Sequence, residues 1–272
     1  MSLLLAFMAG FAETLLRVLP YLVAMGIGFA LLSWWSPGNG GRPWWKKHGL
    51  ATDICYWLVV PILQRYGRIG ITVAITVYVL GINTADGITK FFDHGHGPIS
   101  HLPFWAQVVL YLVFTEFCLY WIHRAFHGTK LWQFHAVHHA SQDLEWISAA
   151  RFHPVNILLG VVAADVAALL AGVTPYVFLV TGPFATITSA FVHANLNWTL
   201  GPFKYVMAGP VFHRWHHTVE HGNCNYASTF PVFDLMFGTF YMPEGALPEN
   251  FGIGEEVVPE SFGRQLVHPL LA

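Results

Sequence analysis

Long apolar runs, separated by short polar segments, follow one another along most of this chain, and several have the length of a membrane helix. A spanning helix needs about 20 mostly apolar residues. Residues 18–35 carry no charge, and residues 102–122 carry only Glu116. Residues 155–172 and 175–192 predict a helical hairpin with a Gly-Val-Thr-Pro turn between its arms. The pattern predicts an all-α integral membrane helical bundle.

The second apolar region is ambiguous. Residues 54–63 and 69–83 are each too short to span, and the polar segment 64–68 lies between them. They predict either one long broken crossing or a shallow hairpin. The bundle therefore has about four to five membrane segments.

The N-terminal residues 2–12 are similar to the apolar part of a signal peptide, but no basic segment precedes them and the apolar run continues to residue 35. We expect an uncleaved membrane segment. From residue 202 the chain becomes polar, aromatic and rich in glycine and proline, which predicts a cap outside the membrane. We divide the chain into N-terminal membrane segments (1–101), a central domain (102–245) that is the candidate for the functional site, and a C-terminal tail (246–272).

Composition agrees with a membrane protein, since 55% of the residues are hydrophobic and the mean hydropathy is +0.50. The net charge of −2 offers no basic field, so we expect no nucleic-acid partner. The three cysteines, Cys55, Cys118 and Cys224, lie far apart and suggest no disulfide framework.

Eight of the sixteen histidines form three tight clusters. The clusters are His123-x-x-x-His127, His135-x-x-His138-His139 and His213-x-x-His216-His217. Residues three and four apart share a helix face, so we expect each cluster to aim its imidazoles at one point. A lone histidine is usually a hydrogen-bonded core residue, but neutral imidazole is also the commonest side-chain metal ligand. Eight converging nitrogens exceed the needs of one tetrahedral ion, so the count predicts two metal ions.

Counting crossings places the three clusters together. The run 102–122 ends at His123, the second cluster follows in the same polar stretch, and the hairpin leaves this side and returns to it at His193. All clusters are therefore expected on one face. The basic residues near this face predict that it is cytoplasmic. They are Arg42, Lys46, Lys47, Arg124, Lys130 and Arg151.

Acidic residues contribute little to the clusters. Soluble di-iron bundles use a Glu-x-x-His motif, which this sequence lacks. Metal-bound histidines usually donate their second N–H to a carboxylate or a carbonyl. Glu116 lies seven residues before His123 on the same helical face, so it is a candidate for that role, with helix packing as the alternative.

The flanks of the clusters carry a family resemblance that covers roughly residues 40–245. His138-His139-Ala-Ser is followed by Arg151-Phe-His153-Pro154, and Phe191-Val-His193-Ala-Asn195 precedes the third cluster. Asn225-Tyr226 and Phe233-Asp234-Leu-Met-Phe237-Gly-Thr-Phe240 follow it. In this order after a spanning helix, these motifs resemble the fatty acid hydroxylase/sterol desaturase superfamily.

The resemblance implies a membrane enzyme whose histidine-rich centre holds two iron ions, with zinc able to replace them during purification. O₂ would be the co-substrate, a C–H bond of a lipid would be hydroxylated, and a separate reductase with a haem or iron–sulfur carrier would supply electrons. The implied ligands are His123, His127, His135, His138, His139, His193, His213, His216 and His217.

Four further residues follow from the same resemblance. Some members have another histidine where this chain has Ser189, which leaves one metal a ligand short. His153 is a candidate to fill that gap, with loop anchoring as the alternative. Asn225 and Asp234, in the C-terminal block, are candidate catalytic residues.

Two alternatives stand beside this interpretation, a lipid desaturase and a membrane metal transporter or sensor, whereas a zinc hydrolase does not fit the number of histidines. A desaturase would use the same centre on the same lipids, which include sterols, hopanoids, carotenoids and acyl lipids. A zinc hydrolase needs only about three ligands, so nine histidines would be surplus. A membrane metal transporter or sensor would need polar residues across the bilayer, whereas the histidines lie at helix ends on one face.

Overall fold

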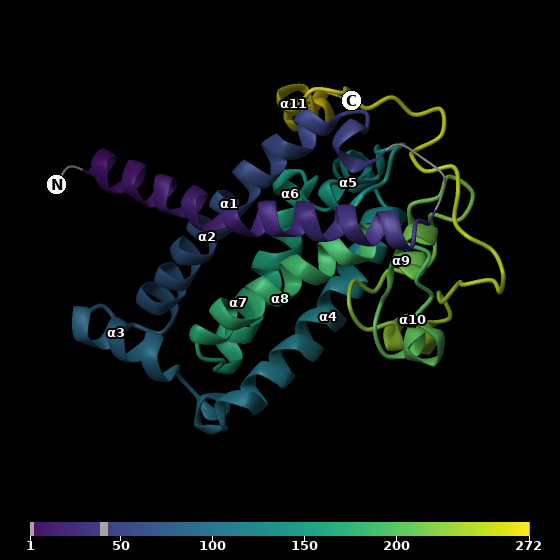
Figure 1. Cartoon of the computed structure of the whole chain (residues 1–272). Coiled ribbons are helices and arrows are strands. Elements are labelled where there is room, and N and C mark those ends of the chain that lie inside the picture. Colours follow the sequence, from purple (N-terminus) through teal and green to yellow (C-terminus); the bar gives the residue numbers. More distant parts are fainter. Residues whose placement is uncertain (1–2, 39–42, 272) are drawn as a thin grey trace.

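The computed structural model describes residues 3–38 and 43–271, and this part of the chain is built from helices (Figure 1). Its only β pairing consists of two isolated bridges between described residues. Five helices are long and apolar enough to cross a membrane. They are α1 (Leu3–Trp35), α2 (Leu50–Ala74) with its π-helical continuation η2 (Ile75–Val79), α4 (Phe104–Gly128), the α6–η5–α7 helix (Pro154–Ala171) and α8 (Tyr176–His193).

The ambiguous second region is one continuous helix. Residues 50–79 form one continuous helix of 30 residues that is long and apolar enough to cross a membrane, so the shallow hairpin is wrong and the expected break at 64–68 does not interrupt the helix. The polar segment 64–68 stays helical because its charges have partners on neighbouring helices. Arg65 donates to Thr14 Oγ1 over 2.7 Å and to Glu13 over 3.2 Å.

The hairpin of α7 and α8 turns where its sequence predicts. Gly172 ends α7 with a positive φ of 99°, which a residue with a side chain rarely adopts. The N–H of Gly172 donates to the Leu169 carbonyl, and the N–H of Val173 donates to the Ala168 carbonyl, both over 3.0 Å. This Schellman arrangement satisfies the last carbonyls of α7 and starts the return of the chain.

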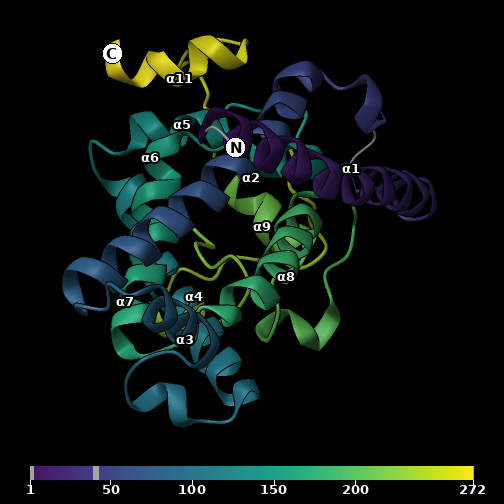
Figure 2. The same ribbon diagram turned by 90° about the vertical axis from the view of Figure 1, so that its left-hand side faces the viewer.

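A cap of short elements covers one end of the bundle, and α3 (Ala85–His94) with η3 (Pro98–His101) lies at the other (Figure 1). The cap elements are η1 (Trp44–Lys46), α5 (Trp132–His139), η4 (Trp146–Ala150), η6 (Gly201–Tyr205), α9 (Pro210–His216), α10 (Val232–Phe237) and α11 (Phe262–Leu271). Figure 2 shows α11 across the outside of the cap, where it contacts α2 and α5. The predicted cap is therefore present. Arg42, one of the basic residues expected near this face, lies outside the described residues.

Aromatic packing fixes the cap to the membrane helices. Trp146 of η4 is 1% exposed and contacts Phe29 of α1, Trp44 of η1 and Trp57 of α2, with ring centroids 5.2 to 6.0 Å apart. The outer face of α1, in contrast, exposes apolar side chains at a four-residue spacing, as a helix in lipid does. These side chains are Val23, Ile27 and Leu31.

Candidate metal centre

Nine histidines converge where the membrane helices meet the cap, in two groups that could each hold one metal ion. In each group one ring nitrogen per residue lies within 4.8 Å of all the others. The five-histidine group comprises His123, His127, His135, His139 and His216. The four-histidine group comprises His138, His193, His213 and His217. The structure thus brings together all nine residues of the expected ligand set.

Each H-x-x-H-H cluster serves both groups, so the expectation that one cluster aims at one point is wrong. His135 and His139 on α5 belong to the five-histidine group, whereas His138 belongs to the four-histidine group. The cluster on α9 is split the opposite way, with His213 and His217 in one group and His216 in the other. Consecutive helix residues point about 100° apart, so adjacent histidines can face two different ions.

Backbone carbonyls set the ring orientation of four of these histidines. In each case Nδ1 lies at hydrogen-bond distance from a carbonyl oxygen, so we assign its proton there and leave Nε2 as a bare acceptor. The pairs are His123 with Tyr226 (2.7 Å), His138 with Arg151 (3.2 Å), His193 with Ser189 (2.7 Å) and His216 with Cys224 (2.6 Å).

The bare nitrogens face one another, which fits a cation between them. Nε2 of His123 and Nε2 of His216 are 2.9 Å apart, and three Nε2 pairs in the four-histidine group are 3.1 to 3.2 Å apart. Protonation does not relieve this repulsion, because burial holds the pKa of the six cluster histidines outside the membrane helices below 6.5. Within the described ranges, the buried Nε2 atoms of His127, His135 and His139 have no hydrogen-bond partner. Neutral, converging imidazoles are the donor set that divalent iron and similar ions take.

Glu116 does not contact a histidine, so its expected partnership with His123 is wrong. Its buried Oε1 accepts the N–H of Thr229 over 2.6 Å and that of Phe230 over 3.2 Å. The partner of His123 is instead the carbonyl of Tyr226, in the same loop. Glu116 therefore positions the loop that orients His123.

The two candidates in the C-terminal block also hold this loop. Asp234 accepts the backbone N–H groups of Tyr226 and Ala227 over 2.8 and 2.9 Å. Asn225 is fully buried with a φ of 52°, and its side chain bonds the backbone of Phe212 and Tyr241 at 2.7 Å. In the described part of the chain, the hydrogen bonds of both side chains go to this loop and its neighbours and not to a clustered histidine, so both hold the loop, and their candidate catalytic role stays a prediction.

His153 lies outside both groups because its two ring nitrogens are used elsewhere. Nδ1 accepts the N–H of Val155 over 3.2 Å, and Nε2 donates to the Leu266 carbonyl over 3.0 Å. It caps α6 and ties it to α11, which is the loop-anchoring alternative.

Ser189 contributes to the site through its backbone carbonyl, which accepts the Nδ1 proton of His193. The four-histidine group thus has no fifth imidazole from this position.

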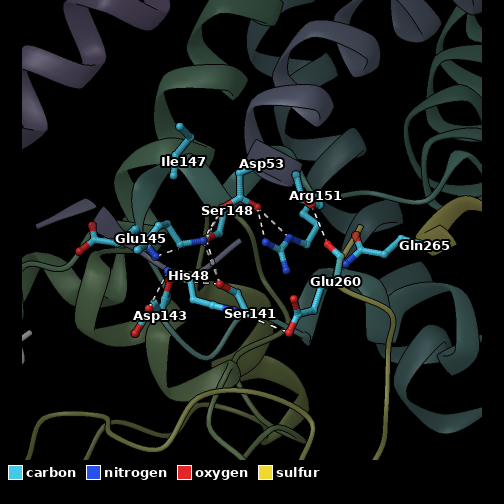
Figure 3. Close-up of polar contacts among 12 residues, drawn as sticks. His48, Asp53, Ser141, Asp143, Glu145, Ile147, Ser148, Arg151, Glu260 and Gln265 are labelled. Carbon is cyan, nitrogen blue, oxygen red and sulfur yellow. Dashed lines mark hydrogen bonds and ion pairs between the residues drawn. The ribbon is translucent and has the colours of Figure 1, made fainter. Parts of the chain in front are cut away.

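A buried charged network supports the four-histidine group (Figure 3). Asp53 of α2 is fully buried and accepts from Arg151 Nε over 2.8 Å and from Arg151 Nη2 over 2.5 Å. Lys47 pairs with the other oxygen of Asp53 and donates to Ser148 Oγ over 2.9 Å. Since the Arg151 carbonyl orients His138, this network fixes that ring from a distance.

A cavity of about 490 Å³ opens onto both groups from within the membrane helices. Side chains of α1, α2, α4 and α8 form most of its wall, and five of the nine histidines line its end at the cap. These are His123, His135, His138, His193 and His213. Its lining also includes Ile187, which is 50% exposed on the bundle surface. The site therefore faces an apolar space in the membrane, which fits a lipid.

Sequence reasoning missed two features of this site. Asn156 lies 2.8 Å from His135 Nδ1, and its own Oδ1 has no partner, so rotating the amide lets it accept the His135 proton. The orienting carbonyls of Tyr226, Arg151 and Cys224 carry no side-chain signature. The Arg151-Phe-His153-Pro154 motif was the one signal that pointed to this region.

Comparisons with known proteins agree with this geometry. The family model described as fatty acid hydroxylase matches residues 108–239. The ornithine lipid hydroxylase OlsE of Rhizobium tropici is 31% identical over 233 residues, which cover 84% of this chain and 68% of that protein.

More distant relatives match about half of the chain. Methylsterol monooxygenase 2-2 of Arabidopsis thaliana is 31% identical over 51% of this chain and 55% of its own length. The Delta(7)-sterol 5(6)-desaturase ERG3A of Gibberella zeae is 28% identical over 51% of this chain and 38% of its own length. No solved structure matches the chain.

The matched segment contains all nine converging histidines, and these three relatives are by name a lipid hydroxylase, a methylsterol monooxygenase and a sterol desaturase. The chain therefore belongs to the fatty acid hydroxylase family and is an oxidoreductase.

Proposed function

We propose that this protein hydroxylates a C–H bond of a membrane lipid, with two iron ions held by the nine histidines as its cofactor and O₂ as its co-substrate. The observation that carries the proposal is the pair of imidazole groups with bare nitrogens, facing an apolar cavity in the membrane helices. The names of the relatives, an ornithine lipid hydroxylase and a methylsterol monooxygenase, support the same class of reaction.

The residues of the chain would bind the metal ions, orient the imidazole rings and shield the site from water. The nine imidazoles would hold the ions, and the carbonyls of Tyr226, Arg151, Ser189 and Cys224 keep the Nδ1 protons away from them. The two iron ions, when bound, supply the redox chemistry that reduces O₂ and places one of its oxygen atoms on the substrate carbon. The apolar cavity wall excludes water from that step.

The reaction requires an electron source. Hydroxylation of R–H consumes one O₂, two electrons and two protons and yields R–OH and one water. We propose a separate reductase with a haem or iron–sulfur carrier as the donor of these electrons.

We propose further that the centre faces the cytoplasm. Two of the basic residues in the charge argument, Lys47 and Arg151, are buried and paired with Asp53, so they do not mark the surface. The argument therefore depends on the other four basic residues, Arg42, Lys46, Arg124 and Lys130. A cysteine-accessibility assay at position 130 in intact cells tests it, because labelling by a membrane-impermeant reagent from outside would contradict a cytoplasmic cap.

The reaction itself is tested by comparing the lipids of cells that express the protein with those of cells that express His138→Ala. The proposal expects lipids that have gained one oxygen atom only with the intact protein. Lipids that have instead lost two hydrogen atoms would identify a desaturase. Unchanged lipids, with iron-loaded protein and a working electron donor, would contradict both.

A further inference from the structure

A charged cluster lies inside the membrane helices, away from the metal centre. Asp165 of α7 accepts from Arg68 Nε of α2 and from Tyr111 Oη of α4, both over 2.6 Å. The Asp165 side chain is 3% exposed, whereas that of Arg68 is 26% exposed. Ionisable groups inside a membrane bundle are costly and are usually retained for a function.

Arg68 faces the cavity that ends at the histidines. Arg68, Gln64 and Tyr111 line one part of the cavity wall, and His123 and His193 line another. Tyr111 and His123 both lie on α4, twelve residues apart, which corresponds to about 18 Å along the helix axis. The cavity thus has a polar region and a metal region, and between them α4 contributes the apolar Leu112, Leu119 and Ile122 together with Thr115 and Glu116.

The ion pair with Asp165 uses only part of the guanidinium. Nε makes the bond to Asp165, and in the described part of the chain neither Nη nitrogen has a hydrogen-bond acceptor. Nη1 lies beside Gly182, which also lines the cavity. Unpaired N–H groups at membrane depth are unfavourable, so they call for an acceptor from outside the protein. The guanidinium carbon also lies 6.0 Å from the centroid of the Phe178 ring, but this cation–π contact engages the face of the guanidinium and not the N–H donors at its edge.

We propose that Arg68 binds the acyl oxygens of a long-chain lipid, a carboxyl, ester or amide carbonyl, whose hydrocarbon chain extends along the cavity to the histidines. A guanidinium presents parallel N–H donors that match such oxygens. The single hydroxyl of a sterol would satisfy fewer of them. Because Asp165 makes the site neutral overall, it accommodates an uncharged ester as well as a carboxylate.

This inference deepens the proposed function by naming the substrate class, because the distance from Arg68 to the centre would fix which carbon reacts. Binding itself depends on neither metal nor turnover. The test is therefore a binding measurement on the purified full chain, with radiolabelled palmitic acid, its methyl ester and hexadecane as probes.

We expect Arg68→Met to weaken the binding of palmitic acid and of its methyl ester about 10- to 100-fold, which corresponds to the loss of a charged hydrogen bond. Hexadecane binding should stay unchanged. The matched control is Arg65→Met, one turn away on α2, because Arg65 pairs with Glu13 and does not line the cavity. If Arg68→Met weakens the binding of palmitic acid alone, Arg68 binds a free carboxylate. If it weakens the binding of both palmitic acid and its methyl ester, Arg68 binds an acyl carbonyl.

Arg68→Met leaves Asp165 without its cation, so Arg68→Lys serves as the second variant. Lysine keeps a charge for Asp165 but lacks the planar fork. Two results would overturn the proposal. The first is that a folded Arg68→Lys variant binds palmitic acid as tightly as the wild type and that Arg68→Met keeps the wild-type preference for palmitic acid over hexadecane. The second is that Arg65→Met loses as much palmitic acid affinity as Arg68→Met. Unmodified lipids in cells would contradict hydroxylation without affecting this result.

Discussion

The five-histidine and the four-histidine group are built from the same motifs but are supported in different ways. The orienting carbonyls of the first come from the loop at 224–226, held by the carboxylates of Glu116 and Asp234. Those of the second come from Ser189 within α8 and from Arg151, which is ion-paired to Asp53. All four histidines of the second group are buried, whereas His123 and His127 of the first are partly exposed.

This difference shows that the number of histidines in a group does not determine how firmly the surrounding structure holds them. The five-histidine group has more imidazoles, but its loop can open locally without unfolding the bundle. The four-histidine group has fewer, but its support joins α2, η1 and η4 through buried charges. We expect the five-histidine group to be the more labile, and the four-histidine group to be the more sensitive to the loss of a single charge.

The largest effect is expected from Asp53→Ala. It leaves Lys47 and Arg151 as buried cations without their carboxylate partner, which costs about 3–5 kcal/mol of unfolding free energy. Chemical denaturation of the purified protein measures the change. Asp86→Ala is the control, because its ion pair with Lys90 is exposed and contributes about 0–1 kcal/mol. Equal losses in the two variants would show that the buried network does not support the fold.

A smaller effect, confined to the five-histidine group, is expected from Asp234→Ala. The N–H groups of Tyr226 and Ala227 lose their acceptor, and the carbonyl that orients His123 becomes mobile. Loss of such a supporting contact typically costs 10- to 100-fold in metal affinity. Competition with a chelator should release one ion per chain early and the other at the wild-type rate. Early release of both ions, or of neither, would contradict separate support.

The third effect concerns the pH dependence of the unfolding free energy, and it depends on Glu145. Burial raises the pKa of Glu145 to about 7 from 4.5, and the nearby Arg214 opposes this rise. Below pH 4.5 the carboxyl is protonated in both states, so its stabilising contribution is fully present. Between pH 4.5 and 7 the unfolded chain loses the proton first, so this contribution decreases by at most about 1.4 kcal/mol per pH unit.

Glu145→Gln removes this decrease. The difference in melting temperature between the variant and the wild type should therefore increase in favour of the variant as the pH rises from 4.5 to 7. The histidines, whose pKa values are lowered, make stability rise with pH, but they do so equally in both proteins, so their contribution cancels in the difference. A difference that does not change with pH would show that Glu145 titrates normally.

Much of this arrangement could be predicted from the sequence, because it depends on length and periodicity. Apolar runs predicted the membrane helices, and counting crossings predicted that the three clusters and His193 meet at one end. The division into regions 1–101, 102–245 and 246–272 stays a prediction, although the family match at 108–239 falls within the second region.

What could not be predicted depends on tertiary geometry. The partner of His123 is a backbone carbonyl 103 residues away, and any residue type could supply it. The choice of Glu116 as that partner followed from helix periodicity, which does not describe the loop that covers the helix. The split of each H-x-x-H-H cluster depends on where α5 and α9 lie relative to each other. Arg68 and Asp165 meet only because α2 packs against α7.

The central claim is that adjacent histidines serve different ions, and metal content measures it most directly. Wild-type protein loaded with Fe²⁺ anaerobically and desalted should retain about two ions per chain. The double variant His135→Ala/His139→Ala removes two ligands of the same group and should retain about one ion. The triple variant His135→Ala/His138→Ala/His139→Ala also removes a ligand of the four-histidine group, so each group keeps three imidazoles and the protein should retain almost no iron. Equal metal content in the double and the triple variant, each folded as judged by circular dichroism, would contradict the two-group centre.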